Sequence, residues 1–202
     1  MGFEPTTPTL ARLCSTPELR PHPMLGFIAH GPAKCNSSGM PATTEDLFRR
    51  LDELGIVTLT TEHPPVFTVE EAKALRGQIP GCHIKNLFLK DKRDQLWLVV
   101  CPEDRVIELK TLPSLIGSAR LSFARSELLR EVLGVEPGAV TPFALINDAG
   151  RRVAVVLDAE LMRADSVNCH PLHNGATTTI EASALLAFIR ACGHTPRLVE
   201  LG

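Results

Sequence analysis

The sequence contains no tyrosine, a single tryptophan and eight phenylalanines among its 202 residues. Such a small supply of aromatic rings argues against a protein that holds many nucleic-acid bases by stacking. The sequence also lacks an excess of charge of either sign, because the formal net charge is only −2. A general polyanion binder is therefore excluded, and any contact with nucleic acid must come from a local basic patch.

Signals for export and for membranes are also missing. The six cysteines form no Cys-x-x-Cys pair and no pattern typical of a secreted disulfide framework. No apolar run approaches the ~20 residues of a membrane-spanning helix. The N-terminus lacks the charged start and apolar core of a signal peptide. We therefore expect a cytoplasmic protein in a reducing compartment, without membrane association.

Motifs for common cofactors and nucleophiles are absent as well. There is no Walker A loop, no dinucleotide-binding fingerprint and no Gly-x-Ser-x-Gly elbow. The segment 169–174, together with Cys192 and His194, is rich in histidine and cysteine, but its spacing matches no common zinc pattern. Cys82 and His83 are neighbours on a predicted strand, so their side chains point to opposite faces and suit a catalytic dyad poorly. We expect no metal and no cofactor.

Residues 1–40 differ in composition from the rest of the chain. They are rich in Pro, Ser and Thr and show no sustained periodicity, so we predict a disordered or poorly ordered N-terminal extension. A well-formed helix start follows directly after Met40, which leads to the hypothesis that Met40 is the biological start. Residues 41–202 have dense apolar periodicity without an internal repeat, and we predict a single domain there.

The apolar pattern of residues 41–202 predicts interleaved helices and strands. Helices are predicted from Thr43 or Thr44 to Gly55 and over 69–77, 126–134 and 181–193. Strands are predicted over 56–61, 81–91, 96–101, 105–110, 142–148, 152–158 and 196–201. Two hairpins are expected, the first joining 81–91 to 96–101 and the second joining 142–148 to 152–158. Hairpins among interleaved helices predict a mixed α/β fold, with a mostly antiparallel sheet and surrounding helices.

Lys85 lies in the middle of its predicted strand, on the face that also carries Leu87 and Leu89. A lysine on an apolar strand face costs free energy unless its charge is used or reaches water. Two further segments offer polar groups for a site. The Gly/Pro-rich turn 134–143 has backbone N–H groups that could bind an oxyanion, and 170–180 is a polar loop. Such parts would hold an ester and a water without a protein nucleophile. The alternative is that Lys85 only reaches solvent.

Six segments gain meaning when they are taken together. They are HPPVFTVEEA 63–72, GCHIKNLFLKD 81–91, LWLV 96–99, ARLSFA 119–124, LGVEPGAVTPFALIND 133–148 and VNCHPLHNGATTTI 167–180. In this order they resemble the YbaK-like aminoacyl-tRNA deacylases, and among them the freestanding prolyl-tRNA editing branch, ProXp-ala. The resemblance runs from about Ala42 to Leu201. It implies the fold of the editing domain that is inserted in bacterial prolyl-tRNA synthetase.

The resemblance also implies an activity, which is the hydrolysis of mischarged Ala-tRNA(Pro) to alanine and free tRNA. The essential lysine of the family falls on Lys85, and the glycine-containing loop of the family falls on Gly138 to Pro142. The His-Pro-x-x-Asn element of the family falls on His170, Pro171 and Asn174.

On this interpretation, Lys85 is a fixed cation beside the reacting ester, and the backbone N–H groups of Gly138 and Ala139 bind the carbonyl oxygen. Water attacks the ester with help from the substrate's own ribose hydroxyl, and no covalent intermediate forms. The residues that we assign to substrate binding are His63, Pro64, Asn86, Pro142, His170 and Asn174.

The partner implied by the resemblance is the acceptor end of mischarged tRNA(Pro), with prolyl-tRNA synthetase or an elongation factor as further partners. We assign the tRNA contact to the basic turn of Lys90, Lys92 and Arg93. The alternative for this turn, and for the cluster of Arg120, Arg125 and Arg130, is ordinary solvated surface charge. The absence of coiled-coil heptads favours a monomer.

Two other functions stay open. The same fold could act on Cys-tRNA or Ser-tRNA, because the volume of the amino-acid pocket is not visible in a sequence. From a different class, the chain could be a non-catalytic module that binds tRNA or a synthetase. The presence of Lys85 and of an intact 138–142 loop argues against the binding module.

Overall fold

The computed structural model describes residues 40–64 and 79–202. The predicted helix over 69–77 and nearly all of the predicted N-terminal extension lie outside these residues. Among the described residues, the helices are α1 (Thr44–Glu53), α3 (Leu112–Ile116), α4 (Ser126–Leu133) and α5 (Ala182–Ala191), with the 3-10 helices η1 (Pro142–Asn147) and η2 (Ala159–Arg163). The strands are β1 (Thr58–Glu62), β2 (Cys82–Asp91), β3 (Leu96–Pro102), β4 (Leu121–Phe123), β5 (Val153–Asp158), β6 (Ser166–Cys169), β7 (Ala176–Glu181) and β8 (Arg197–Val199).

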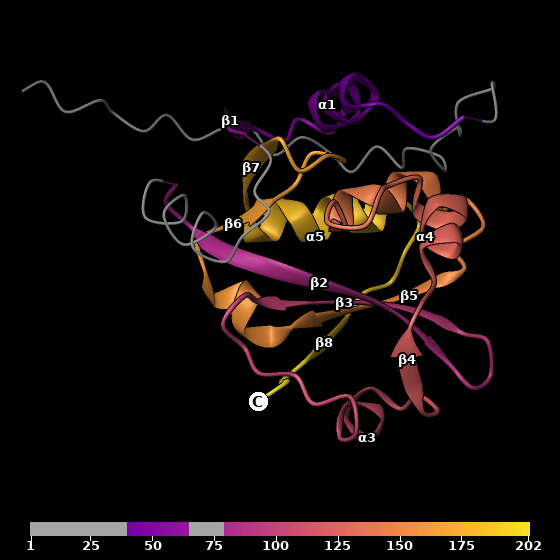
Figure 1. Cartoon of the computed structure of the whole chain (residues 1–202). Coiled ribbons are helices and arrows are strands. Elements are labelled where there is room, and N and C mark those ends of the chain that lie inside the picture. Colours follow the sequence, from indigo (N-terminus) through magenta and orange to yellow (C-terminus); the bar gives the residue numbers. More distant parts are fainter. Residues whose placement is uncertain (1–39, 65–78) are drawn as a thin grey trace, which may run out of the picture.

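The eight strands of the described residues belong to one sheet with the order β1-β7-β6-β2-β3-β5-β8, and β4 pairs separately with β2. The pairs β1–β7, β2–β3, β2–β4 and β6–β7 are antiparallel. The pairs β2–β6, β3–β5 and β5–β8 are parallel. This arrangement confirms the predicted mixed α/β sheet and its antiparallel majority. Strand β2, which contains Lys85, lies in the middle of the sheet, with the parallel strand β6 on one side and the antiparallel strand β3 on the other (Figure 1).

The two faces of the sheet carry separate apolar clusters. One cluster includes Phe88 and Phe143, and the other includes Leu89, Trp97 and Ile116. Figure 1 shows α1, α4 and α5 on one side of the sheet and α3 on the other. Because side chains alternate along a strand, the even-numbered residues of β2 face the α4 and α5 side and the odd-numbered ones face the α3 side.

Local capping explains why two of the predicted helices begin and end where they do. The Thr43 hydroxyl accepts a hydrogen bond from the Asp46 N–H, and the Asp46 carboxylate accepts one from the Thr43 N–H. This capping box satisfies two backbone N–H groups at the start of α1. Gly134 ends α4 with a φ of 64°. A Cβ at this glycine would also lie 2.6 Å from the Pro41 side chain, so position 134 requires glycine for two reasons.

The predicted second hairpin is wrong. Residues 142–147 form the 3-10 helix η1 instead of a strand, and β5 pairs in parallel with β3 and β8. Pro142 occupies the first turn of η1, and the Thr141 hydroxyl accepts a hydrogen bond from the Phe143 N–H (3.3 Å). Phe143, Ala144 and Leu145 are all buried. A short run that is buried on every side has no polar face, so its period does not distinguish a helix from a strand.

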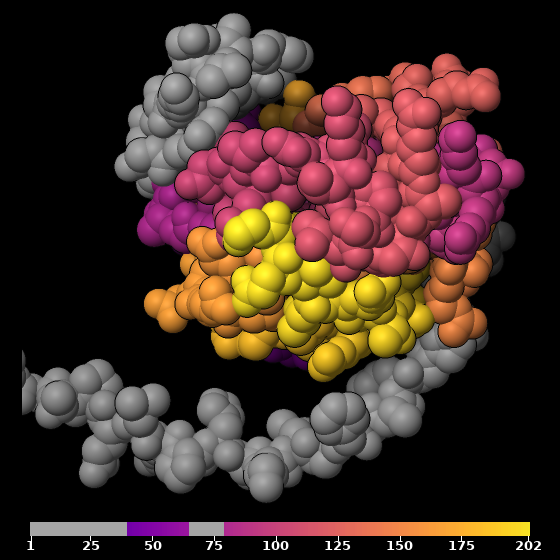
Figure 2. All heavy atoms as spheres, turned by 90° about the horizontal axis from the view of Figure 1, so that it is seen from below, coloured from indigo at the N-terminus to yellow at the C-terminus, as the bar shows by residue number. Residues whose placement is uncertain are grey.

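The predicted strand over 105–110 is also absent. Val106 is 81% exposed, and the carbonyl oxygen of Arg105 accepts a hydrogen bond from Lys85 rather than from a neighbouring strand. The side chain of Arg105 ties this segment to the C-terminus through a hydrogen bond from Nη1 to the Gly202 carbonyl oxygen (2.9 Å). Figure 2 shows the segment that follows β3 beside the C-terminal residues, on the face of the molecule that α3 covers.

Several elements were not predicted from the sequence. They are α3, η2, the short strand β4, and the hairpin of β6 and β7, which occupies most of the segment interpreted as a polar loop. In β7, Thr177 and Thr178 are buried. Threonine is β-branched and favours strands, so the run of three threonines at 177–179 was the available signal for this strand.

Candidate active site

Lys85 projects from β2 to the α3 side, where Leu87 and Leu89 also pack, as its spacing predicts. Its ammonium group donates hydrogen bonds to the carbonyl oxygens of Glu103 (3.0 Å) and Arg105. An ammonium group has three N–H donors, so one N–H is left for a ligand. The two backbone oxygens thus hold the half-buried ammonium group in one place. Their hydrogen bonds offset the free energy that a charge loses in apolar surroundings.

The segment that holds Lys85 is itself anchored by a buried carboxylate. Arg105 Nε donates to Asp158 Oδ2 (3.0 Å), and the Asp158 side chain is fully buried at the end of β5. The guanidinium of Arg105 also pairs with Glu160. Burial opposes the charge of Arg105, but Asp158 and Glu160 together raise the pKa of Arg105. Arg105 and Asp158, which sequence analysis missed, therefore fix the carbonyl group that Lys85 uses.

Asn86 projects to the opposite face of β2. Its Nδ2 donates to the carbonyl oxygen of Val140 (2.9 Å), and this contact attaches the 138–142 loop to the strand next to Lys85. Its Oδ1 is buried and has no hydrogen-bond partner among the described residues. A buried acceptor without a partner costs free energy. The Oδ1 atom of Asn86 thus has no donor among the described residues.

The 138–142 loop presents backbone N–H groups, but not the pair that sequence analysis named. The Ala139 N–H donates to the Glu136 carbonyl oxygen (3.0 Å) and is thus occupied. Among the described residues, the N–H groups of Gly138, Val140 and Thr141 have no acceptor. Gly138 has a φ of 90°, a conformation that side-chain-bearing residues rarely adopt. Pro142 is buried at the start of η1.

A gap in the sheet brings Lys85 and Asn86 to an edge. Strands β6 and β4 both pair with the edge of β2 that faces away from β3, β6 at Cys82 and His83 and β4 at residues 89–91. Within residues 40–64 and 79–202, no strand pairs with that edge between these two points. Lys85 and Asn86 therefore lie on a stretch of β2 whose outer edge has no paired strand among the described residues, and their side chains leave the strand on opposite faces.

Two histidines from different elements line the neighbouring hairpin of β6 and β7. His170 Nδ1 lies 3.1 Å from the Ala176 carbonyl oxygen, which can only accept, so Nδ1 bears the proton and Nε2 is left as an acceptor in the neutral ring. Burial lowers the pKa of His170, and the charges of His63 and His173 lower it further. His63 Nε2 accepts from the Thr177 hydroxyl (2.9 Å), while its Nδ1 donates to Pro64 O (2.9 Å).

The remaining predicted site residues lie in or beside two turns, one between β6 and β7 and the other between β2 and β3. Asn174 lies half-buried in the turn between β6 and β7, and the carbonyl oxygen of Pro171 in that turn accepts from the Thr44 hydroxyl (3.1 Å). In the basic turn, Lys90 Nζ pairs with Asp94 (2.6 Å). Lys92 and Arg93 are exposed.

The four cysteine thiols among the described residues are poor nucleophiles. Burial raises the pKa of Cys101 to about 11 and that of Cys192 to about 12, and it raises the pKa of Cys82 and Cys169 as well. A thiol attacks as its thiolate, so none of these four groups is activated. Across the described part of the chain, no three His, Cys, Asp or Glu side chains gather closely enough to hold a metal ion.

Comparisons with known proteins identify the family of this chain. A profile described as "Aminoacyl-tRNA editing domain" matches residues 63–188, which include Lys85, the 138–142 loop and His170. The chain belongs to the aminoacyl-tRNA editing domain family. The matched range contains every group of the site described above, including Arg105 and Asp158.

Two curated relatives have similar sequences over nearly their full length. The prolyl-tRNA editing protein ProX of Acetoanaerobium sticklandii is 40% identical over 153 residues, which are 75% of this chain and 93% of that protein. The prolyl-tRNA synthetase associated domain-containing protein 1 of Danio rerio is 40% identical over 174 residues, 83% of this chain and 95% of that protein. These relatives place the editing domain within its prolyl-tRNA editing branch.

A solved structure supports the fold. The crystal structure of a proposed trans-editing enzyme for prolyl tRNA synthetase superposes with a TM-score of 0.60 at 21% identity, over 80% of this chain and 99% of that chain. At this identity the likeness concerns the fold alone.

Among the helices of the described residues, none is long and apolar enough to cross a membrane.

Proposed function

We propose that this protein is a trans-editing hydrolase that deacylates mischarged Ala-tRNA(Pro) and releases alanine and free tRNA. Membership of the editing family supports the reaction class. The observation on which the proposal rests is the buried Oδ1 of Asn86, which has no partner among the described residues and belongs to the side chain that is hydrogen-bonded to the 138–142 loop. Together they form a set of acceptors and donors suited to an aminoacyl ester, without a protein nucleophile.

The substrate binds through complementary groups. The α-ammonium group of the esterified amino acid donates to Asn86 Oδ1. The carbonyl oxygen of the ester accepts hydrogen bonds from the N–H groups of Gly138 and Val140. These two donors make the loop the oxyanion-binding site. The third N–H of Lys85 points to the ribose-phosphate of the terminal adenosine, where a fixed cation holds the 3′ end in place.

Hydrolysis needs one water and no cofactor. The water oxygen attacks the ester carbon, and the substrate's ribose hydroxyl, as the adjacent base, takes and relays its proton. The bond between the ester carbon and the ribose oxygen then breaks, and that oxygen leaves with the proton. The products are free alanine and a tRNA with an intact 3′-terminal ribose. Nε2 of neutral His170 accepts a hydrogen bond that orients the ester end of the substrate.

The editing enzyme is needed for alanine because prolyl-tRNA synthetase discriminates poorly between alanine and proline. A site built for proline excludes the smaller alanine poorly, because missing methylene groups change binding by only ~1–3 kcal/mol. A second site that admits alanine and rejects proline by size corrects the error. Prolyl-tRNA synthetase and an elongation factor are the proteins that would hand over or compete for the same tRNA, and the cytoplasm is where this exchange takes place.

The choice of amino acid is tested by single-turnover deacylation of four esters of the same tRNA(Pro), carrying alanine, serine, cysteine or proline. We expect rapid loss of alanine alone. Rapid loss of cysteine or serine with alanine retained would assign the protein to another editing substrate. If all four esters survive while tRNA still binds, the protein is a binding module and the hydrolase proposal is refuted.

A further inference from the structure

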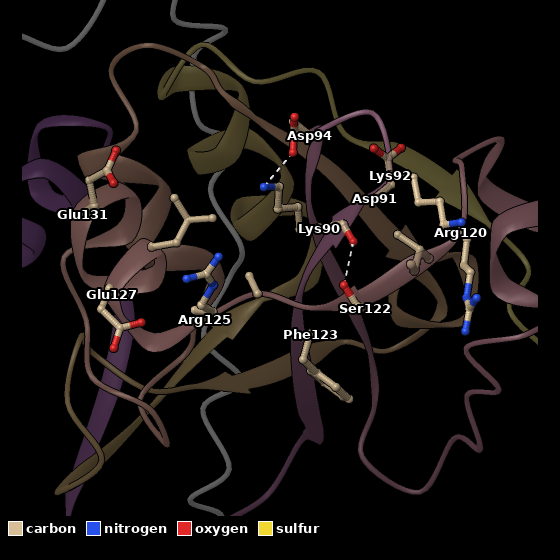
Figure 3. Close-up of a pocket in the computed structure, with 13 residues that line it drawn as sticks. Lys90, Asp91, Lys92, Asp94, Arg120, Ser122, Phe123, Arg125, Glu127 and Glu131 are labelled. Carbon is tan, nitrogen blue, oxygen red and sulfur yellow. Dashed lines mark hydrogen bonds and ion pairs between the residues drawn. The ribbon is translucent and has the colours of Figure 1, made fainter.

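A groove of about 720 Å³ opens at the far end of β2, between the β2–β3 turn, β4 and the start of α4 (Figure 3). The pairing of β2 with β4 brings together two basic clusters that are thirty residues apart in sequence, because Lys90 lies opposite Ser122 in the register. The groove thereby unites Lys92 of the first cluster with Arg120 and Arg125 of the second.

Three of the four acidic side chains that line the groove are already used, and the fourth, Glu127, accepts a hydrogen bond from the Ser126 hydroxyl (3.3 Å) and forms no salt bridge among the described residues. Asp94 pairs with Lys90 (2.6 Å), and Glu131 pairs with Arg152 outside the groove (2.6 Å). Asp91 is buried, and its carboxylate accepts from the backbone N–H groups of Arg93 (2.8 Å), Gln95 (3.1 Å) and Ala119 (3.2 Å). Burial opposes the charge of Asp91, but these hydrogen bonds prevail and lower its pKa. Asp91, Asp94 and Glu131 therefore form no salt bridge with Lys92, Arg120 or Arg125, and Glu127 is the one acid of the groove without a salt bridge among the described residues.

Three cations in the groove have no acidic partner among the described residues, namely Lys92, Arg120 and Arg125. Two of them face each other. The Lys92 N–H donates to the Arg120 carbonyl oxygen (3.1 Å), which continues the β2–β4 register by one residue, and Figure 3 shows both side chains on the same side. Like charges directly opposite each other across two strands destabilise the pair. An anion between them would remove that repulsion.

An exposed aromatic ring lies at the same groove. Phe123 of β4 is 63% exposed, although apolar burial would stabilise the fold. Its partner in the β2–β4 register is Leu89, so the ring leaves the sheet on the α3 side, opposite to Lys92 and Arg120. The cations therefore determine the ligand of the groove, and the phosphates of a nucleic acid suit several Lys and Arg side chains without a paired carboxylate.

The position of the groove agrees with a nucleic-acid ligand that enters the editing site. Lys90 and Asn86 lie on the same face of β2, four residues apart, which is about 14 Å at ~3.4 Å per residue. A stacked nucleic-acid strand advances about 3.4 Å per nucleotide. A strand whose terminal ribose is at Lys85 and Asn86 therefore reaches the groove about four nucleotides from its 3′ end.

We propose that this groove binds the phosphates of the tRNA acceptor end about four nucleotides from the esterified terminus, with Lys92 and Arg120 on either side of one phosphate. The proposal rests on the proposed function. It replaces Arg93, which does not line the groove, by Arg120 and Arg125 in the set of tRNA contacts.

Binding of uncharged tRNA(Pro) tests the groove independently of catalysis. Each cation that is lost should lower the slope of log K against log salt by about 0.7–0.9. At 0.1 M salt this corresponds to about 5- to 8-fold weaker binding for Lys92→Ala or Arg120→Ala, and to the product of the two in the double variant. The matched control is Arg163→Ala, since Arg163 is 68% exposed, pairs only with exposed Glu200 and lies outside the groove. It should bind as wild type does.

Deacylation of two substrates separates the two hypotheses. On Ala-tRNA(Pro) the groove variants should raise KM and leave kcat unchanged. On an alanylated CCA trinucleotide, which is too short to reach the groove, they should match wild type. Wild-type affinity and salt slope in the double variant would overturn the groove proposal and leave the editing function intact. A double variant that binds tRNA(Pro) as wild type does and loses only its binding to prolyl-tRNA synthetase would have the same meaning. Failure of wild type to hydrolyse either substrate, with the salt slope changed as expected, would refute the editing function and retain the groove.

Discussion

Replacement of Asn86 by leucine separates stability from activity at the proposed site. The substitution removes the hydrogen bond from Nδ2 to the Val140 carbonyl oxygen (2.9 Å), which is worth about 1 kcal/mol. It also removes the buried Oδ1 atom, which has no partner and whose desolvation costs about 1–3 kcal/mol. The two terms have opposite signs, so we expect the free energy of unfolding to change by less than about 2 kcal/mol.

Asn168 provides the matched control on the adjacent strand β6. Both ends of its amide are satisfied, because Nδ2 donates to the Pro80 carbonyl oxygen (3.2 Å) and Oδ1 accepts from the Thr179 hydroxyl (2.7 Å). Asn168→Leu therefore breaks two hydrogen bonds and relieves no orphaned atom. We expect it to lower the free energy of unfolding by about 2–3 kcal/mol and to leave the rate of folded enzyme unchanged.

Activity should respond in the reverse order. A hydrogen bond to the charged ammonium group of the substrate is worth about 1.5–3 kcal/mol, so Asn86→Leu should lower kcat/KM for Ala-tRNA(Pro) by about 10- to 150-fold. Urea denaturation gives the stabilities, and single-turnover deacylation gives the rates. The reasoning is refuted if Asn86→Leu is destabilised as much as Asn168→Leu and hydrolyses the ester at the wild-type rate.

Three further predictions follow from the same contacts. Lys85→Arg should abolish deacylation, since a planar guanidinium does not fit the two carbonyl oxygens that hold the compact ammonium group; near-wild-type hydrolysis would show that charge alone suffices. Asp158→Asn should lower kcat while the Kd for tRNA stays constant, because it releases Arg105 and with it one carbonyl partner of Lys85; an equal loss in tRNA affinity would place Asp158 in binding instead. Burial lowers the pKa of His170 and His194 from 6.5, so the folded protein binds fewer protons than the unfolded chain. The free energy of unfolding should thus have its highest value above about pH 6.5 and decline as the pH falls below 6.5. A urea midpoint that is constant from pH 7.5 to 5.5 would contradict this.

Sequence reasoning succeeded where the signal was local. The strand containing Lys85, the cap of Thr43 and the helix end at Gly134 each follow from residues within a few positions. The same reasoning identified Lys85 as a residue in need of an explanation, because a charge on the same strand face as Leu87 and Leu89 is visible without any tertiary information.

It failed where the partner comes from elsewhere in the chain. The carbonyl oxygens that hold Lys85 come from residues 18 and 20 positions away, in a segment whose alternating pattern suggested a strand. The groove cations are similarly joined only by the pairing of β2 with β4. The occupied N–H of Ala139 is a property of one turn, and composition gives no sign of it.

The most direct test of the account is single-turnover hydrolysis of Ala-tRNA(Pro) by wild type and Lys85→Ala, with tRNA affinity measured on the same samples. The account predicts rapid release of alanine by wild type and loss of that release in Lys85→Ala, with both proteins folded. Equal release by the two proteins would contradict the role of Lys85, and no release by wild type would contradict the proposed function itself.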